Sequence, residues 1–381
     1  MNSHVSGKKL SLLFGAFLVL FLLVAMLMDD DLTAAVKSRS TRKGVKSIPS
    51  QMSSAGMYTG PLFATSEKTG DNPLVLSKLL PNMKRHDVRW AILYVMFEEE
   101  DLEEDDDVSE EEGDDEMTDA QYLRSVLLKA PGTIVPFFST GIGGEEEGKL
   151  AGLELTTMYA YGIAQGKTEL GENVLKGIGE VELYAWNMPH DDQRVFQLFD
   201  LASANGLAIM FHPSSGQKKA LEAILKRYPK TTFLMHLFPE DFARDRQMVI
   251  DLMSAYSNLH FTIDVDHMLF DQQAQTGLLY KFEGSSPTMA ASSFKTDFDR
   301  QRAQLLQTAI SRYQPLIIAH PDRVTWGTEM SEDYTFDNEV YDRMIKFVRE
   351  FIGSLPKGVQ EKVAYKNAQR LFGKGVTLKA R

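Results

Sequence analysis

The chain has 381 residues, 43% of them hydrophobic, a formal net charge of −12 and no cysteine. This length and apolar content suffice for one large domain or two small ones, and the lack of cysteine excludes disulfides and thiolate metal ligands. No basic face interleaved with aromatic residues stands out, so we expect no nucleic-acid partner.

An apolar segment near the N-terminus predicts a membrane anchor. Residues 10–28 carry no charge and follow Lys8 and Lys9; their length suits a bilayer span and exceeds the apolar core of a cleavable signal. We therefore expect residues 1–32 to be a single-pass anchor and residues 33–57, rich in small and polar residues, to be a flexible linker. The lysines before the span favour a cytoplasmic N-terminus and a domain outside the cytoplasm, although basic residues after the span count the other way.

Residues 58–381 contain eight apolar runs separated by helical stretches. The runs fall at 61–65, 91–97, 133–139, 177–183, 207–212, 232–237, 259–265 and 324–328. Alternation of strand and helix predicts a mainly parallel sheet. Eight such units in this length fit an α/β fold of the closed (β/α)8 TIM barrel type better than an open sheet. Helical spacing of apolar residues predicts helices at 195–205, 218–228, 337–351 and 357–371.

Two segments exceed the barrel pattern. Residues 98–119 hold 16 Asp and Glu and no Lys or Arg, so the rest of the chain carries +4 (−12 + 16). Such a charged run cannot bury enough apolar surface to order itself, which predicts a disordered surface insertion. Residues 268–297 follow the seventh strand, on the side of a barrel where loops shape or cover the site.

His212 and His236 are the strongest indication of chemistry. Each ends an apolar run, and the two runs are joined by one helix, which predicts parallel neighbouring strands with both imidazoles at matching C-terminal ends. Two histidines at equivalent positions favour a shared metal or acid-base site over two separate strand caps.

For several other ionisable residues the sequence either leaves the orientation of the side chain open or predicts a local role outside the site. Glu180 and Glu182 share one face of their strand, so both point into the barrel or both lie at its rim, and Asp264 and Asp266 carry the same ambiguity. His267 is expected to be a local loop histidine. His320 is expected to be local too, because it precedes the eighth strand at the end opposite a barrel's catalytic face.

Five short motifs stand out at 177–180 (GIGE), 211–213 (FHP), 235–236 (MH), 322–329 (DRVTWGTE) and 362–372 (KVAYKNAQRLF). Together they resemble the amidohydrolase superfamily, most closely its amidohydrolase-related branch of metal-dependent hydrolases and decarboxylases. The resemblance covers roughly residues 60–373. It implies a TIM barrel with a divalent ion, often zinc, at the C-terminal ends of the strands. By resemblance His212 takes the fifth-strand ligand position, His236 the sixth and Glu329 the eighth.

The first strand departs from the family pattern. Where the family has Asp-x-His-x-His, this chain reads FATSE at 63–67, and no histidine lies between His4 and His86. A site can still be assembled from His212, His236 and a carboxylate from Glu180 or Glu329, because two histidines and a carboxylate form a catalytic zinc set.

The sequence thus leads to the hypothesis of a metal-dependent hydrolase acting on an amide, ester or lactone carbonyl. Glu329 serves as ligand or general base, and His236 polarises the substrate oxygen or ligates the ion. Two alternatives stay open: a catalytically inactive barrel that serves as a membrane-tethered binding or scaffold module, and a metal-dependent decarboxylase.

Overall fold

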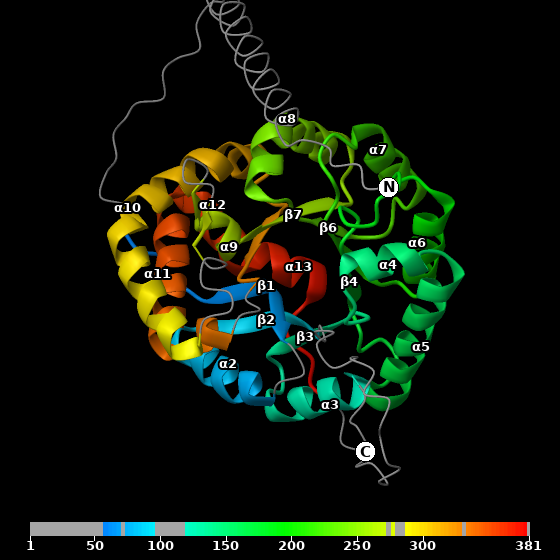
Figure 1. Cartoon of the computed structure of the whole chain (residues 1–381), viewed down its shortest axis with the longest axis horizontal. Helices are drawn as coiled ribbons and strands as arrows, with labels where there is room; N and C mark the ends of the chain where they lie inside the picture. The colour runs from blue at the N-terminus through cyan, green and yellow to red at the C-terminus, as the bar shows by residue number, and fades with distance from the viewer. Residues whose placement is uncertain are drawn as a thin grey trace, which may run out of the picture. The chain divides into compact units, whose positions relative to one another are not determined.

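Eight strands pair in parallel and close into a barrel, in the order β1-β10-β7-β6-β5-β4-β3-β2 (Figure 1). The structure, a computed structural model, describes residues 56–69, 73–95, 119–271, 276–278, 286–329 and 333–378, which belong to one unit, 54–381. The expected barrel is confirmed, and each expected run overlaps a strand. The strands are β1 (Leu62–Thr69), β2 (Val88–Val95), β3 (Ile134–Phe138), β4 (Gly177–Val181), β5 (Ala208–Phe211), β6 (Phe233–Met235), β7 (Leu259–Asp264) and β10 (Val324–Gly327).

Three expectations concern residues that are not described. The anchor at 10–28 lies wholly outside the described residues, and so do the linker, apart from 56 and 57, and the acidic insertion, apart from 119. Among the helices that the structure describes, none is long and apolar enough to cross a bilayer.

Helices surround the barrel as an outer ring (Figure 1). They are α2 (Pro73–Arg85), α3 (Asp119–Lys129), α4 (Gly144–Leu150), α5 (Leu153–Leu170), α6 (Gln193–Ala204), α7 (Lys218–Arg227), α8 (Pro239–Ala255), α10 (Pro287–Ala319) and α11 (Asn338–Ser354). The 33-residue α10 begins within the long segment at 268–297, which also holds the short α9 (Val265–Met268) in part and the paired strands β8 (Phe270–Asp271) and β9 (Thr276–Gly277). After η3 (Asp333–Phe336) and α11, the chain closes with α12 (Lys357–Glu361), the π-helical η4 (Lys362–Lys366) and α13 (Asn367–Phe372).

Both faces of the strands are buried, which is why the strands read as nearly continuous apolar runs. One cluster lies between the barrel and its helices, and a second fills the barrel with alternate residues of the strands, including Tyr94, Met210 and Leu234. Ala368 and Phe372 of α13 belong to this inner cluster, so α13 covers the N-terminal end of the barrel. The opposite end is left to polar side chains.

The strand register aligns the positions where these side chains emerge. Phe211 pairs with Met235, and Gly327 pairs with Asp264, so the residues that follow β5, β6, β7 and β10 meet at one end. β4 carries a register shift between Ile178 and Val181, both of which pack in the outer cluster. This shift breaks the period-two alternation and turns Glu180 into the barrel.

Candidate metal and acid-base site

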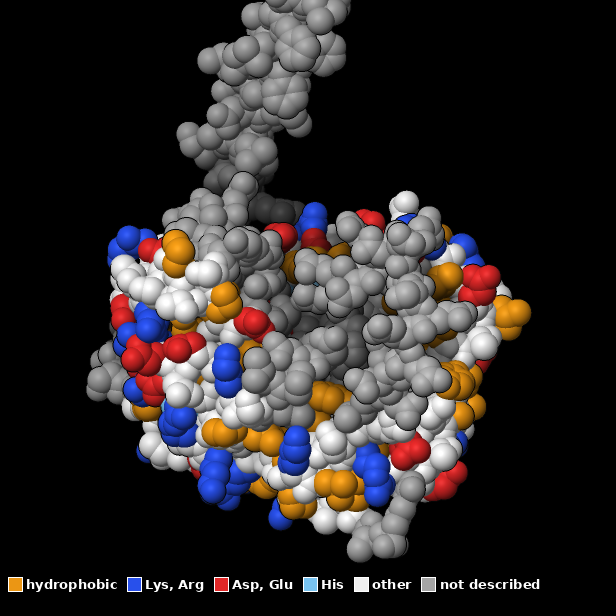
Figure 2. All heavy atoms as spheres, turned by 60° about the horizontal axis from the view of Figure 1, so that its bottom comes forward, with side chains coloured by type: hydrophobic (Ala, Val, Ile, Leu, Met, Phe, Trp, Pro, Cys, Tyr) orange, Lys and Arg blue, Asp and Glu red, His pale blue; other side chains and the backbone are white. Residues whose placement is uncertain are grey.

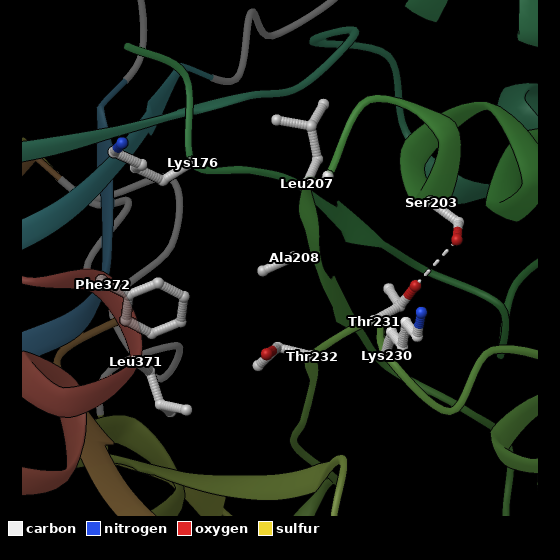
Figure 3. Close-up of a pocket in the computed structure, with 10 residues that line it drawn as sticks. Lys176, Ser203, Leu207, Ala208, Lys230, Thr231, Thr232, Leu371 and Phe372 are labelled. Carbon is white, nitrogen blue, oxygen red and sulfur yellow. Dashed lines mark hydrogen bonds between the residues drawn. The ribbon is translucent and has the colours of Figure 1, made fainter. Parts of the chain in front are cut away.

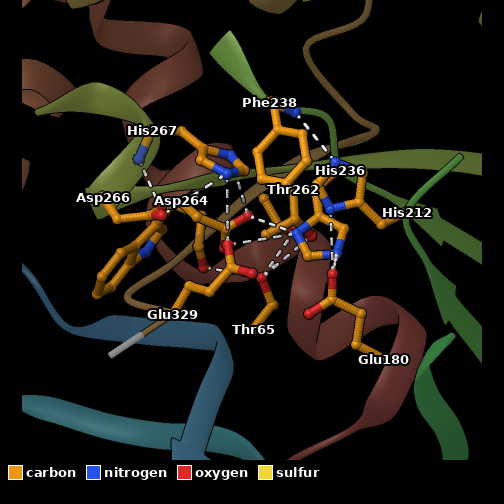
Figure 4. Close-up of polar contacts among 12 residues, drawn as sticks. Thr65, Glu180, His212, His236, Phe238, Thr262, Asp264, Asp266, His267 and Glu329 are labelled. Atoms are coloured by element: carbon orange, nitrogen blue, oxygen red, sulfur yellow. Dashed lines mark hydrogen bonds and ion pairs between the residues drawn. The ribbon is translucent and has the colours of Figure 1, made fainter. Parts of the chain in front are cut away.

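Seven ionisable side chains converge at the C-terminal end of the barrel (Figure 4). All are at most 5% exposed and come from five neighbouring strand ends and from α9: Glu180, His212, His236, Asp264, Asp266, His267 and Glu329. The structure therefore brings together all four sequence-predicted site residues, and it resolves the ambiguity of Asp264 and Asp266 in favour of the interior.

Glu180 lies at the centre of one half of the site. Its Oε1 is 3.2 Å from His212 Nδ1 and 2.6 Å from His236 Nε2, and its Oε2 accepts a hydrogen bond of 3.3 Å from the hydroxyl of Tyr94. Gly179 makes this position possible, because a Cβ there would lie 2.4 Å from the carbonyl oxygen of Met210 and φ is +128°.

The tautomer of His212 follows from its backbone partner. Phe238 N–H donates to His212 Nε2 at 3.1 Å, so Nε2 carries no proton and Nδ1–H donates to Glu180. Burial lowers the pKa of His212 to about 4, which keeps the ring neutral near pH 7. To bind an ion through Nδ1, the neutral ring of His212 would have to carry its proton on Nε2, which could then no longer accept the hydrogen bond from Phe238.

His236 is fully buried among carboxylates. Its Nδ1 lies 2.9 Å from Asp264 Oδ2 and 3.5 Å from Glu329 Oε2. Burial lowers the pKa of this imidazole, but the charges of Glu180 and Glu329 and the bond to Asp264 outweigh it, so its pKa lies well above the usual value. Nε2 lies close enough to Glu180 to form an ion pair with it, so both nitrogens of the ring face a carboxylate.

In the other half of the site, around His267, the distances between side-chain atoms are longer. His267 Nε2 lies 3.7 Å from both Asp266 Oδ2 and Glu329 Oε2, and Nδ1 lies 3.9 Å from Asp264 Oδ2, all beyond hydrogen-bond distance. The expectation that His267 is a local loop histidine was wrong, because the α9 turn directly after β7 folds it back over the strand ends. The sequence feature that could have indicated this role is the position of His267 directly after Asp266 and close to Asp264.

Two features of this half are unusual for the residues involved. The backbone of Glu329 has φ +50°, a left-handed conformation that is unfavourable for residues other than glycine. Such conformations are concentrated at functional sites, where the surrounding structure holds the residue in place. Burial raises the pKa of Asp266 to about 7, and burial together with the charge of Glu329 raises that of Asp264.

Threonines of β1, β7 and β10 lie beneath the cluster. Thr65 Oγ1 donates to the carbonyl of Trp326 at 2.8 Å and lies 3.4 Å and 3.1 Å from the hydroxyls of Thr262 and Thr325. The sequence of β1, LFATSEKT, contains no histidine, so this strand contributes no imidazole to the site.

Glu182 and His320 lie outside the cluster. Glu182, past the end of β4, accepts a hydrogen bond from Gly144 N and so leaves the face that it was expected to share with Glu180. His320 Nε2 contacts the carbonyl of Ile250 at 2.9 Å, and its Nδ1 contacts Arg323, which confirms a local role away from the catalytic end.

The donor set fits a divalent ion. The cluster contains four buried carboxylates against three imidazoles, one of them neutral, so a cation relieves the excess of negative charge. Three groups of side chains have ligand atoms close enough to share an ion: Glu180, His212 and His236; His236, Asp264 and Glu329; Asp266, His267 and Glu329. The 3.7 Å spacings in the third group suit ligand atoms that surround one ion at about 2.1 Å.

Comparisons with known proteins give similarities of fold. No family model matches the sequence, and no curated protein matches it. Similar solved structures include an amidohydrolase from Burkholderia multivorans with bound zinc (12% identity, 83% of this chain and 100% of that chain, TM-score 0.46). They also include a 5-carboxyvanillate decarboxylase from Novosphingobium aromaticivorans complexed with manganese (12%, 82% and 96%, 0.42) and an amidohydrolase 2 from Bifidobacterium longum subsp. infantis (9%, 82% and 99%, 0.40). These identities are too low to transfer an activity to this chain.

Proposed function

We propose that this protein is a metal-dependent hydrolase that acts on an amide, ester or lactone carbonyl. The observation that supports this function is the convergence of four buried carboxylates and three histidines at the C-terminal end of the barrel. The reaction class comes from the motif resemblance. Zinc is the first candidate for the ion, and His236 and Glu329 are its first candidate ligands, joined by His212 and Glu180 or by His267 and Asp266.

A bound divalent ion supplies Lewis acidity, which polarises a carbonyl and lowers the pKa of water. The side chains of the protein provide proton transfer and positioning. Glu180, His236 and Asp264 are at most 2% exposed, whereas Asp266, His267 and Glu329 are 4–5% exposed. Of these three, Glu329 serves in this proposal as a ligand or as the general base that accepts a proton from a nucleophile. His212, held by Phe238, orients Glu180.

The mouth of the site also carries aromatic rings. Tyr184, which is 36% exposed, lies 4.7 Å from the ring of His212 and 5.0 Å from that of Phe238, measured between centroids. Phe238 in turn lies 6.0 Å from His267. These rings form an apolar wall that excludes water from one side of the polar cluster.

Metal content of the full-length protein tests the proposal. We would measure zinc, manganese and iron by elemental mass spectrometry in the parent and in His236→Ala, Glu329→Gln, His212→Ala and His267→Ala variants. His320→Ala is the matched control, because it removes a histidine at the other end of the barrel. Near-stoichiometric metal that is lost in His236→Ala and Glu329→Gln but retained in His320→Ala supports the proposal.

The other two variants assign the remaining ligands. Loss of metal in His267→Ala but not in His212→Ala indicates that His267 and Asp266 complete the set with His236 and Glu329. The reverse result indicates that His212 and Glu180 complete it. A parent protein that takes up no metal even with excess ion would refute the proposal and favour the inactive scaffold. Metal with release of carbon dioxide from aromatic acids, and no hydrolysis, would favour the decarboxylase.

The anchor at residues 10–28 and an extracytoplasmic barrel stay part of this proposal. Protease protection in sealed membrane vesicles distinguishes the two orientations, and release of the protein by alkaline carbonate would refute the anchor.

A further inference from the structure

A cavity of about 480 Å³ lies at the N-terminal end of the barrel (Figure 3). Lys176 directly precedes β4, Ala208 begins β5 and Thr232 directly precedes β6, while Leu371 and Phe372 of α13 form the facing wall. The volume is within the range of small-molecule sites.

This cavity is distinct from the polar cluster. The strands run in parallel, so residues that start them lie at the end opposite Glu180, His212 and His236. From Ala208 to His212 the chain advances four residues along β5, about 13 Å at the rise of a strand. The same strands therefore have the cavity at their N-terminal ends and the candidate metal site at their C-terminal ends, and no side chain belongs to both.

The charge of the lining is positive. Lys176 and Lys230 lie on opposite sides of the cavity in Figure 3, and no Asp or Glu lines it among the described residues. Lys176 Nζ donates to the carbonyl of Asn173 at 2.7 Å, and neither lysine forms an ion pair within the described part of the chain. By contrast, Lys149, Lys295 and Lys346 each contact a carboxylate.

The rest of the lining combines apolar surface with hydroxyl groups. Leu207, Ala208, Leu371 and Phe372 offer aliphatic and aromatic contacts, and the hydroxyl of Thr232 lies toward the facing wall (Figure 3). A second cavity of about 420 Å³ between α2, β2 and α3 is the natural comparison. It also contains two lysines, Lys84 and Lys129, together with Asp87 and Arg89, which pair with each other.

We propose that the cavity beside α13 binds a small organic anion, a carboxylate or phosphate monoester on an aromatic or alkyl body. One of the two ammonium groups pairs with the anionic head, since charged hydrogen bonds are the strong ones, and the apolar body packs on Leu371 and Phe372. A free inorganic anion satisfies only the first requirement, and a neutral aromatic molecule only the second.

Calorimetric titration of the full-length protein with phenyl phosphate tests this proposal. Inorganic phosphate and benzyl alcohol are the matched probes that lack the apolar body and the charge. The Lys176→Met/Lys230→Met variant removes both charges and keeps apolar stems. Lys84→Met/Lys129→Met is the control with the same change in net charge in the other cavity, and thermal denaturation checks that both variants fold.

We expect phenyl phosphate to bind the parent and the control equally, and the Lys176→Met/Lys230→Met variant about tenfold or more weakly. Both matched probes should bind the parent about tenfold more weakly than phenyl phosphate. No binding by the parent, equal binding by the two double variants, or equal binding of benzyl alcohol would overturn the proposal. Because the metal site is at the other end of the barrel, metal content should be unchanged in both variants, whichever way the hydrolase proposal is decided.

Discussion

Replacing Glu147 by glutamine should stabilise this protein at pH 8 and change it little at pH 5. Glu147, in α4, is 1% exposed and away from the polar cluster. Its Oε1 accepts hydrogen bonds from Thr140 at 3.1 Å and Tyr159 at 2.9 Å, and its Oε2 accepts from Trp186 Nε1 at 3.2 Å. These are neutral donors, so among the described residues no ion pair offsets the buried charge.

The expected magnitude follows from the pKa. Burial raises the pKa of Glu147 from 4.5 to about 8, against the lowering by its three hydrogen bonds. The folded state therefore binds more protons than the unfolded state between these values, and stability is lost as the pH rises through them. At about 1.4 kcal/mol per pKa unit, ionisation of Glu147 costs about 3–5 kcal/mol between pH 5 and pH 8.

Glutamine can reproduce the neutral form. Its carbonyl oxygen can accept from Trp186, and its NH₂ can donate to the hydroxyl oxygens of Thr140 and Tyr159. Urea denaturation of the parent and Glu147→Gln at pH 5, 6.5 and 8 measures the difference directly. The control is Glu145→Gln, at an exposed position two residues before Glu147 in α4. Equal pH slopes for the parent and Glu147→Gln would refute the reasoning.

Three further substitutions test packing and hydrogen bonding by urea denaturation. Gly179→Ala should destabilise the fold by about 2–4 kcal/mol, because the new methyl meets Met210 O at φ +128°; a loss below about 1 kcal/mol would contradict this. Thr65→Val should cost about 1–2 kcal/mol by leaving the carbonyl of Trp326 without its donor, and no loss would mean that water replaces the hydroxyl. Asp337→Ala should cost about 1 kcal/mol, because Asp337 caps α11 by accepting from two backbone N–H groups, whereas Asp337→Asn should retain most of that stability.

Local patterns in the sequence predict most of the barrel. Strands covered on both sides are runs of apolar residues, and their helices carry apolar residues at helical spacing, so eight strand-helix units are visible without tertiary information. His212 and His236 are also predictable, because they follow the inward-facing Met210 and Leu234 by two residues.

The remainder of the candidate site depends on features that have no local signal. Glu180 faces inward only because the register shifts within β4, and His267 joins the cluster only because the chain turns immediately after β7. The N–H of Phe238, from another loop, decides which nitrogen of His212 carries the proton.

The sequence by itself determined the fold class and the two histidines, because burial and strand alternation repeat over neighbouring residues. Only the tertiary structure decided which carboxylates surround them, which imidazoles are neutral or charged, and that Lys176 and Lys230 share one cavity. These properties depend on distances and desolvation between residues far apart in the chain, which no short sequence pattern encodes.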